Sequence, residues 1–250
     1  MKASIDSIET FGLVDGPGIR CVVFFNGCML RCKFCHNPEM WKKRDDNYTP
    51  EELYKRIKRC EPYFKKNGGV TFSGGEPLLQ SEFIIEVCKL LKKDNIHVAI
   101  DTSGVGLGHY EEILSYVDLV LLDIKHTSPE GYQDITGLKM EEVEKFIDVC
   151  NKMNKKIWIR QVIVPGVTDT YEYMDSLIKY LEHIHNVERV DFLPFHRLGR
   201  EKYIKLGIPY PYEEKQDMDK EKCNQLYDYF KERYFGSMSN SVGETKTYDK

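Results

Sequence analysis

Short apolar runs alternate with segments of helical periodicity along most of the chain. Six runs have the length and the β-branched or aromatic composition of strands, and they cover residues 20–25, 69–73, 97–101, 119–124, 156–164 and 190–195. Strand–helix alternation of this kind implies parallel strands that are joined by crossover helices. The pattern therefore predicts an α/β fold, either an incomplete barrel or an open doubly wound sheet.

Helical segments are marked by apolar residues at spacings of three and four. They include residues 84–91, 143–150 and 174–181, and a closing helix is expected over residues 213–234. Thr49, Pro50 and Glu52 form a capping-box pattern with proline in the first helical turn. We expect one domain over residues 1–235. Residues 236–250 are rich in serine, threonine, glycine and lysine and are expected to form a flexible tail.

Composition narrows the class of protein. The chain has 250 residues and a formal net charge of −4, and its cationic and anionic residues are interspersed. Nucleic acid is therefore not expected as a main partner, because phosphate backbones are bound by clustered lysine and arginine. No apolar run is long enough to span a bilayer, and the first residues lack the layout of a signal peptide. We expect a cytoplasmic protein that does not bind membranes.

Three cysteines lie within eight residues, in the pattern C-x3-C-x2-C at Cys28, Cys32 and Cys35. In a reducing compartment, a total of eight cysteines favours metal or redox chemistry over disulfide bonds. Three thiolates can hold three corners of a [4Fe–4S] cluster and leave its fourth iron open for a small molecule. A zinc site with His36 as fourth ligand is the alternative, although chelation of one ion by the adjoining Cys35 and His36 is awkward.

The other five cysteines occupy apolar faces of the expected strands and helices. We expect them to be small core residues rather than ligands. They are Cys21, Cys60, Cys88, Cys150 and Cys223.

Polar residues lie at or near the ends of several expected strands. Because the carboxyl ends of parallel strands meet on one face of an α/β fold, we expect these side chains to share a site. They are Glu76, Asp101, Asp123, Lys125, Arg160 and His196.

The cysteine pattern, with an aromatic residue before its last cysteine and Gly74-Gly75-Glu76-Pro77 further on, resembles the radical S-adenosylmethionine superfamily. Further motifs resemble the activating enzymes of pyruvate formate-lyase within it, and the similarity covers about residues 3–235. These motifs are Val14-Asp15-Gly16-Pro17-Gly18-Ile19-Arg20, Cys35-His36-Asn37, Asp123-Ile124-Lys125, Trp158-Ile159-Arg160, Val164-Pro165-Gly166 and Leu193-Pro194-Phe195-His196. Cys60 is the only cysteine between Cys35 and Gly74. The cysteine-rich insert that other glycyl-radical activases often carry in this region is therefore absent.

The resemblance implies a fold, cofactors and residues that bind them. The fold would be a partial (β/α)6 barrel of the TIM type in a single domain. Cys28, Cys32 and Cys35 would ligate a [4Fe–4S] cluster, and S-adenosylmethionine would chelate its open iron. The residues implied to contact S-adenosylmethionine are Phe34, Cys35, His36, Gly75, Glu76, Asp123, Ile124, Lys125, Arg160 and His196.

Individual roles also follow from the resemblance. Gly75 and Glu76 would receive the amino group of S-adenosylmethionine, and Arg160 would neutralise its carboxylate. The adenine would lie against residues 34–36, while residues 123–125 and His196 would position the ribose and methionine portions. Asp101 and Thr102 match a place where the family can hold a monovalent cation. Asp15 is expected near the cluster, in contact with the protein partner.

The implied function is activation of pyruvate formate-lyase under anaerobic conditions. Reductive cleavage of S-adenosylmethionine would give methionine and a 5′-deoxyadenosyl radical, which abstracts hydrogen from a glycine of the partner. The electron donor would be a protein such as flavodoxin or ferredoxin. Two alternatives remain open at this point: an activase of a different glycyl-radical enzyme, and a zinc-stabilised binding module without catalysis.

Overall fold

The computed structural model describes residues 1–237, and they divide into two compact units. The first unit comprises Met1–Met29, Met40–Asp123 and Glu141–Ile157. The second unit comprises Leu30–Glu39, Ile124–Met140 and the described residues from Trp158 onward. The boundary between Met29 and Leu30 falls inside the cysteine pattern, so that Cys28 belongs to the first unit and Cys32 and Cys35 belong to the second.

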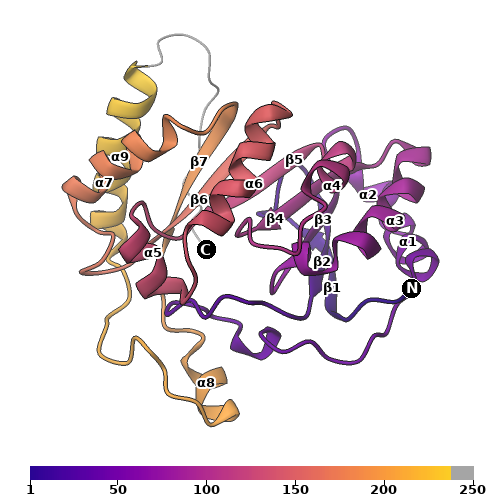
Figure 1. Ribbon diagram of the computed structural model, residues 1–250, viewed down its shortest axis with the longest axis horizontal. Coiled ribbons are helices and arrows are strands. Elements are labelled where there is room, and N and C mark those ends of the chain that lie inside the picture. Colours follow the sequence, from indigo (N-terminus) through magenta and orange to yellow (C-terminus); the bar gives the residue numbers. More distant parts are fainter. Residues whose placement is uncertain (238–250) are drawn as a thin grey trace. The chain divides into compact units, whose positions relative to one another are not determined.

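Within residues 1–237, seven strands are ordered along one sheet as they are in the chain (Figure 1). They are β1 (Ile5–Gly12), β2 (Arg20–Phe25), β3 (Gly69–Gly74), β4 (His97–Thr102), β5 (Leu119–Ile124), β6 (Ile157–Ile163) and β7 (Val187–Pro194). Strands β2 to β5 pair in parallel, whereas β1 pairs antiparallel with β2. The predicted α/β fold is confirmed, with the strand and helix order of a partial (β/α)6 barrel.

The six expected strands are all present, and β1 is the strand that the apolar pattern missed. Its residues alternate only weakly, and most of its side chains are partly or fully exposed. An antiparallel edge strand pairs on one side only, so its sequence needs no continuous apolar run.

Nine α-helices connect or follow the strands in the described part of the chain. They are α1 (Pro50–Lys58), α2 (Glu61–Phe64), α3 (Ser81–Leu91), α4 (Tyr110–Tyr116), α5 (Pro129–Thr136), α6 (Glu141–Lys152), α7 (Tyr171–Leu181), α8 (Arg200–Leu206) and α9 (Lys220–Ser237). Three short 3₁₀ helices are η1 (Pro38–Met40), η2 (Pro77–Gln80) and η3 (Lys92–Asp94). None of the helices within residues 1–237 is both long enough and apolar enough to cross a membrane.

The helical predictions are confirmed where periodicity and capping agree. Thr49 Oγ1 accepts the main-chain N–H of Glu52 at 3.2 Å, and Glu52 Oε2 accepts the N–H of Thr49 at 2.8 Å. This capping box satisfies two donors at the start of α1 that have no partner inside the helix. Helices α3, α6 and α7 bury the apolar stripes that predicted them. In the second unit, α7 and α9 pack side by side next to β7 (Figure 1).

The predicted start of the closing helix is wrong. Helix α9 begins at Lys220, after Asp219, whose Oδ1 accepts the N–H of Lys222 at 2.7 Å and so caps the helix. Before it, residues 213–214 belong to a turn and residues 215–219 have no regular secondary structure. In this stretch the N–H of Met218 donates to the carbonyl of Phe195 at 2.8 Å. The helix continues to Ser237, and the rest of the expected tail, residues 238–250, lies outside the described residues.

The five cysteines predicted as core residues are all buried, with 0–3% of each residue exposed. Burial raises the pKa of Cys88 and Cys150 to about 12 and that of Cys223 to about 11. Because a thiol ligates metal as a thiolate, these raised pKa values disfavour ligation by the buried helix cysteines. The core interpretation is confirmed.

Candidate functional site

In the first unit, the carboxyl ends of four parallel strands bring several predicted site residues to one edge. Phe25 pairs with Gly74 across β2 and β3, and Thr102 pairs with Leu122 across β4 and β5. The residues that end or follow these strands are therefore neighbours. They are Cys28, Gly75, Glu76, Asp101, Thr102 and Asp123.

Gly74, the last residue of β3, and Gly75, which follows it, allow close contact between two main-chain segments. Gly74 has φ of 114°, which side chains rarely permit, and a Cβ on Gly75 would lie 2.3 Å from the carbonyl oxygen of Gly27. The N–H of Gly75 donates to the carbonyl of Phe25, and the N–H of Glu76 donates to the carbonyl of Gly27, both at 2.8 Å. This turn is thereby held beside the segment that leads directly to Cys28.

Glu76 is fully buried, and its carboxylate accepts four hydrogen bonds from its own chain. The donors are the hydroxyl of Thr102 at 2.5 Å, the N–H and hydroxyl of Ser103 at 2.8 and 2.5 Å, and the N–H of Leu78 at 3.1 Å. Burial raises its pKa to about 7, although these hydrogen bonds act to lower it. The carboxylate thus joins the start of η2 to the end of β4.

These four hydrogen bonds hold the Gly75 turn in place. Contact between the Glu76 carboxylate and an ammonium group stays a prediction. Sequence reasoning missed Ser103, although it directly follows Thr102 at a predicted strand end.

Asp101 and Thr102 are also linked to neighbouring strands. The hydroxyl of Ser73 at the end of β3 donates to Asp101 Oδ2 at 2.7 Å. The Thr102 hydroxyl donates to Glu76 and accepts the N–H of Gly104 at 2.9 Å. These contacts fix both side chains, and binding of a monovalent cation beside them remains a prediction.

The loop that carries Asp15 is anchored to β2 and β3. It joins β1 to Arg20, the first residue of β2, whereas Cys28 follows the last residue of that strand. Buried Arg20 donates to Thr71 Oγ1 at 2.9 Å, and the Thr71 hydroxyl donates to the carbonyl of Asp15 at 2.6 Å. Thr71 pairs with Val22 in the middle of β2, so this hydrogen bond places the Asp15 carbonyl level with the middle of the two strands. The expected position of Asp15 near the cluster stays a prediction.

In the second unit, we call residues Leu30–Glu39 the cysteine segment. The N–H of Cys35 donates to the carbonyl of Cys32 at 2.9 Å, which closes a turn between the two ligand candidates. The N–H groups of Arg31 and Lys33 donate to the carbonyls of Thr136 and Ile135, at 2.8 and 3.0 Å. These carbonyls end α5 and have no partner within the helix. The cysteine segment and the end of α5 therefore satisfy each other's main-chain groups.

The chain after β7 also contacts the cysteine segment. The rings of His36 and His196 have centroids 5.6 Å apart, and a Cβ on Gly199 would lie 2.6 Å from Cα of His36. The hydroxyl of Tyr203 donates to the carbonyl of Cys35 at 3.1 Å. His196 Nδ1 is buried without a hydrogen-bond partner among residues 1–237. This atom is therefore available to form a hydrogen bond with a polar group of a ligand. Sequence reasoning missed Tyr203, and no motif marks it.

Two predicted cationic residues have partners within the second unit. Lys125 Nζ lies 5.5 Å from the ring centroid of Phe34, within cation–π range. Arg160 lies on β6, and its charge acts on Asp191 of β7, which is 5% exposed. Burial raises the pKa of Asp191, while Arg189 and Arg160 act to lower it. Asp191 was not among the predicted residues.

The chemistry of the three-cysteine set fits an iron–sulfur cluster. None of these cysteines forms a disulfide, and Cys28 and Cys35 are partly exposed. Residues 28–37 adopt neither helix nor strand, so the main chain can present several thiols in different directions. Within the described residues, no three Cys, His, Asp or Glu side chains already surround one metal position. The ligand assignment rests on the sequence spacing and on the core positions of the other five cysteines, which are Cys21, Cys60, Cys88, Cys150 and Cys223.

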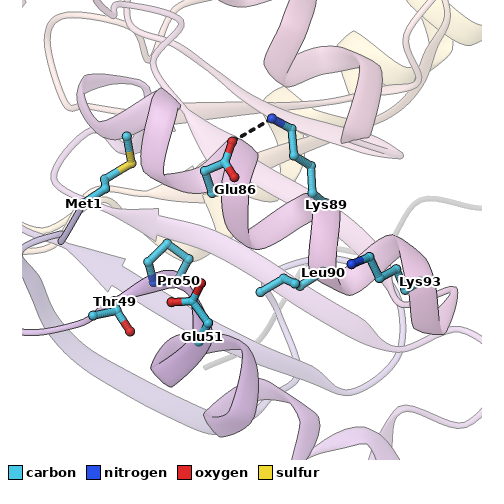
Figure 2. Close-up of a pocket in the computed structure, with 8 residues that line it drawn as sticks. All are labelled: Met1, Thr49, Pro50, Glu51, Glu86, Lys89, Leu90 and Lys93. Carbon is cyan, nitrogen blue, oxygen red and sulfur yellow. Dashed lines mark hydrogen bonds and ion pairs between the residues drawn. The ribbon is translucent and has the colours of Figure 1, made fainter.

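A separate hollow of about 470 Å³ lies between α1, α3 and the first residue of the chain (Figure 2). Glu86 and Lys89 form an ion pair of 2.6 Å in its wall. The hollow contains none of the predicted site residues, and its wall offers no set of ligands or nucleophiles.

Comparison with known protein sequences identifies relatives over nearly the whole chain. The model of the Radical SAM superfamily matches residues 22–181. A pyruvate formate-lyase-activating enzyme of Clostridium pasteurianum is 52% identical over 230 residues, covering 91% of this chain and 97% of the relative. Another, from Staphylococcus epidermidis, is 39% identical over 239 residues, covering 92% of this chain and 95% of the relative.

Solved structures support the fold. Streptococcus suis SuiB bound to its precursor peptide SuiA has a TM-score of 0.70 at 17% identity, and the match covers 96% of this chain and 50% of SuiB. This chain therefore spans about half the length of that protein. A domain of a pyruvate-formate lyase-activating enzyme from Bacteroides vulgatus has a TM-score of 0.54 at 23% identity, covering 71% of this chain and 99% of the domain.

Proposed function

The chain belongs to the radical SAM superfamily and, within it, to the pyruvate formate-lyase-activating enzymes, and from this premise we propose that it generates a glycyl radical on pyruvate formate-lyase under anaerobic conditions. When bound, a reduced [4Fe–4S] cluster supplies the electron that cleaves S-adenosylmethionine into methionine and a 5′-deoxyadenosyl radical, which takes hydrogen from the glycine. The names of both relatives support pyruvate formate-lyase as the partner.

One contact carries the proposal: the N–H of Glu76 donates to the carbonyl of Gly27 at 2.8 Å. It holds the Gly75 turn beside the main chain that enters Cys28. The turn proposed to bind the amino group of S-adenosylmethionine is thus fixed next to the first cysteine proposed to hold the cluster. The turn is held by hydrogen bonds within the chain itself, so its position is set by the fold.

We propose that Cys28, Cys32 and Cys35 hold three irons of the cluster. Main-chain groups at Gly75 receive the amino group of S-adenosylmethionine, while the Glu76 carboxylate holds this turn against the end of β4. Arg160 neutralises the carboxylate of S-adenosylmethionine, because a guanidinium matches a carboxylate with two parallel hydrogen bonds. In this scheme Asp191 helps to orient Arg160 before the ligand binds.

Further residues would enclose the adenosine portion. His196 Nδ1 supplies a buried polar atom without a hydrogen-bond partner among residues 1–237, and the ring of Phe34 offers an apolar surface to the adenine. The remaining members of the proposed shell are Cys35, His36, Asp123, Ile124 and Lys125. Asp101 and Thr102 are the proposed neighbours of a monovalent cation.

The partner loop must place its glycine directly beside the radical carbon, because a primary carbon radical abstracts hydrogen from any nearby C–H or S–H bond that is weaker than the one it forms. Asp15 remains a proposed partner contact near the cluster. The proposed electron donor is a small redox protein such as flavodoxin or ferredoxin, and the proposed compartment is the cytoplasm. Membership of the family leaves the zinc-stabilised module without support.

The test is a radical assay under strict exclusion of oxygen. The chain is reconstituted with iron and sulfide, reduced, and incubated with S-adenosylmethionine and pyruvate formate-lyase. Electron paramagnetic resonance should show a glycyl radical on the partner, and methionine and 5′-deoxyadenosine should accumulate. A pyruvate formate-lyase variant with alanine in place of the radical glycine is the matched control. A chain that carries about four irons and cleaves S-adenosylmethionine, yet gives a radical only on another glycyl-radical enzyme, would refute the proposed partner.

A further inference from the structure

Helix α8 and the residue before it contact the cysteine segment at three points, all within the second unit. Gly199 packs so closely on His36 that a Cβ would lie 2.6 Å from Cα of His36. Lys202 Nζ donates to Asn37 Oδ1 and pairs with Glu39 Oε1, both at 2.5 Å. The Tyr203 hydroxyl donates to the carbonyl of Cys35 at 3.1 Å. These contacts cover the carboxyl-terminal half of the segment that carries two of the proposed cluster ligands.

The hydroxyl of Tyr203 is placed by the buried face of α8. Only 1% of Tyr203 is exposed, and its ring packs edge-on against Tyr210 with centroids 5.0 Å apart. This packing holds the ring so that its hydroxyl reaches the carbonyl of Cys35.

The acceptor is the main chain of a proposed ligand residue. Cys35 is held through its N–H by the carbonyl of Cys32 and through its carbonyl by Tyr203. With both flanking peptide groups fixed, rotation of the main chain at Cys35 is restricted, and with it the direction in which the Cα–Cβ bond points. A hydrogen-bonding partner that orients a ligand in this way strengthens metal binding, because less freedom is lost when the metal arrives.

We propose that Tyr203 is a positioning residue for Cys35, and that α8 and the cluster stabilise each other through this hydrogen bond. The inference rests on the proposed function, since it requires that Cys35 ligates the cluster. A helix of seven residues is unstable by itself, so α8 depends on contacts such as this one. Coupling between two sites is reciprocal. Cluster binding should therefore protect the main-chain amides of residues 200–206, and the Tyr203 hydroxyl should slow release of iron.

The experiment compares Tyr203→Phe with Tyr229→Phe in the full chain, reconstituted without oxygen. Tyr229 provides a matched control, because its hydroxyl donates to Asp175 Oδ1 at 3.0 Å on α7 rather than to the cysteine segment. The measurement is the rate at which iron is lost to an excess of a ferrous chelator. Loss of one hydrogen bond corresponds to about three- to tenfold, so we expect release from Tyr203→Phe to be faster by that factor. Release from Tyr229→Phe should match that of the unsubstituted chain.

Two further measurements separate positioning from a general effect on folding. The metal-free forms of both variants should unfold at similar temperatures, and hydrogen exchange should show cluster-dependent protection of residues 200–206 that is smaller in Tyr203→Phe. Equal iron release from Tyr203→Phe and the unsubstituted chain would overturn the inference. So would faster release accompanied by a much lower unfolding temperature of the metal-free variant. If the unsubstituted chain itself fails to bind about four irons, the proposed function fails instead.

Discussion

Substitution of Glu76 by glutamine tests whether this residue holds the cofactor turn from within the protein. Each carboxylate oxygen accepts two hydrogen bonds, from Leu78 and Thr102 at Oε1 and from Ser103 at Oε2. A glutamine has only one such oxygen, and its NH₂ group would face a main-chain N–H in either orientation. A buried donor left without an acceptor costs about 1–3 kcal/mol. We expect the metal-free Glu76→Gln chain to be less stable by about that amount at pH 8.

The size of this loss should depend on pH, because only the unsubstituted chain can titrate at this position. Burial raises the pKa of Glu76 from 4.5 to about 7, a difference that corresponds to about 3 kcal/mol. Since the pKa is raised on folding, the stabilisation from the protonated carboxyl is full below pH 4.5. It is lost as the pH rises through about 7. The stability gap between the two chains should therefore widen by about 2–3 kcal/mol from pH 8 to pH 5.

The assay is chemical unfolding of both metal-free chains in urea, followed by circular dichroism at pH 8 and pH 5. Glu52→Gln is the control, because hydrogen bonds from Thr49 lower the pKa of the exposed Glu52 carboxyl. The difference in stability between Glu52→Gln and the unsubstituted chain should stay almost constant from pH 8 to pH 5, because both values lie above the ordinary pKa of 4.5. A Glu76→Gln gap that stays constant or narrows between pH 8 and pH 5 would show that the four hydrogen bonds outweigh burial. Weaker S-adenosylmethionine binding with unchanged stability would instead support direct contact between the carboxylate and the amino group.

Three other predictions concern the proposed site. Alanine at Cys28, Cys32 or Cys35 should each abolish binding of four irons, whereas alanine at the buried helix cysteines should not; iron and sulfide analysis decides between these outcomes. Arg160→Lys should weaken binding of S-adenosylmethionine by about one to two decades at unchanged iron content, since lysine keeps the charge but loses the planar fork; equal affinity in equilibrium binding would count against this role. Asp15→Asn should lower glycyl-radical yield while leaving S-adenosylmethionine affinity unchanged, because Asp15 is proposed to contact the partner rather than the cofactor; parallel losses in both would place it with the cofactor or the fold.

The strands of the sheet were predictable because burial on both faces demands continuous apolar runs, as in β2 and β5. Helices were predictable when they were long enough to show a stripe or carried a capping signal, as in α1 and α3. The short helices α4, α5 and α8 have seven or eight residues each. Such helices are stabilised by contacts with distant parts of the chain, so their local sequence carries only a weak signal.

The residues of the candidate site were predictable where they lie at the carboxyl ends of strands. Parallel pairing brings the ends of β3, β4 and β5 together wherever the strands are correctly located, and Gly75, Asp101 and Asp123 needed no further information. The environment of each side chain was not predictable in this way. The donors at Ser103 lie 27 residues from Glu76 in the sequence, and nothing in either segment indicates that a carboxylate would be fully buried there.

The place of Asp15 was not predictable from its sequence position for a related reason. Asp15 and Cys28 are close in sequence, and both belong to motifs of the same family, but the complete strand β2 lies between them. Their separation therefore depends on how the loop of residues 13–19 runs beside that strand, and a hydrogen bond from distant Thr71 decides this. The contact uses the main-chain carbonyl of Asp15, which asparagine retains. Asp15→Asn should therefore leave the loop anchored while it changes the proposed contact with the partner, and this is why the substitution should separate partner activation from cofactor affinity.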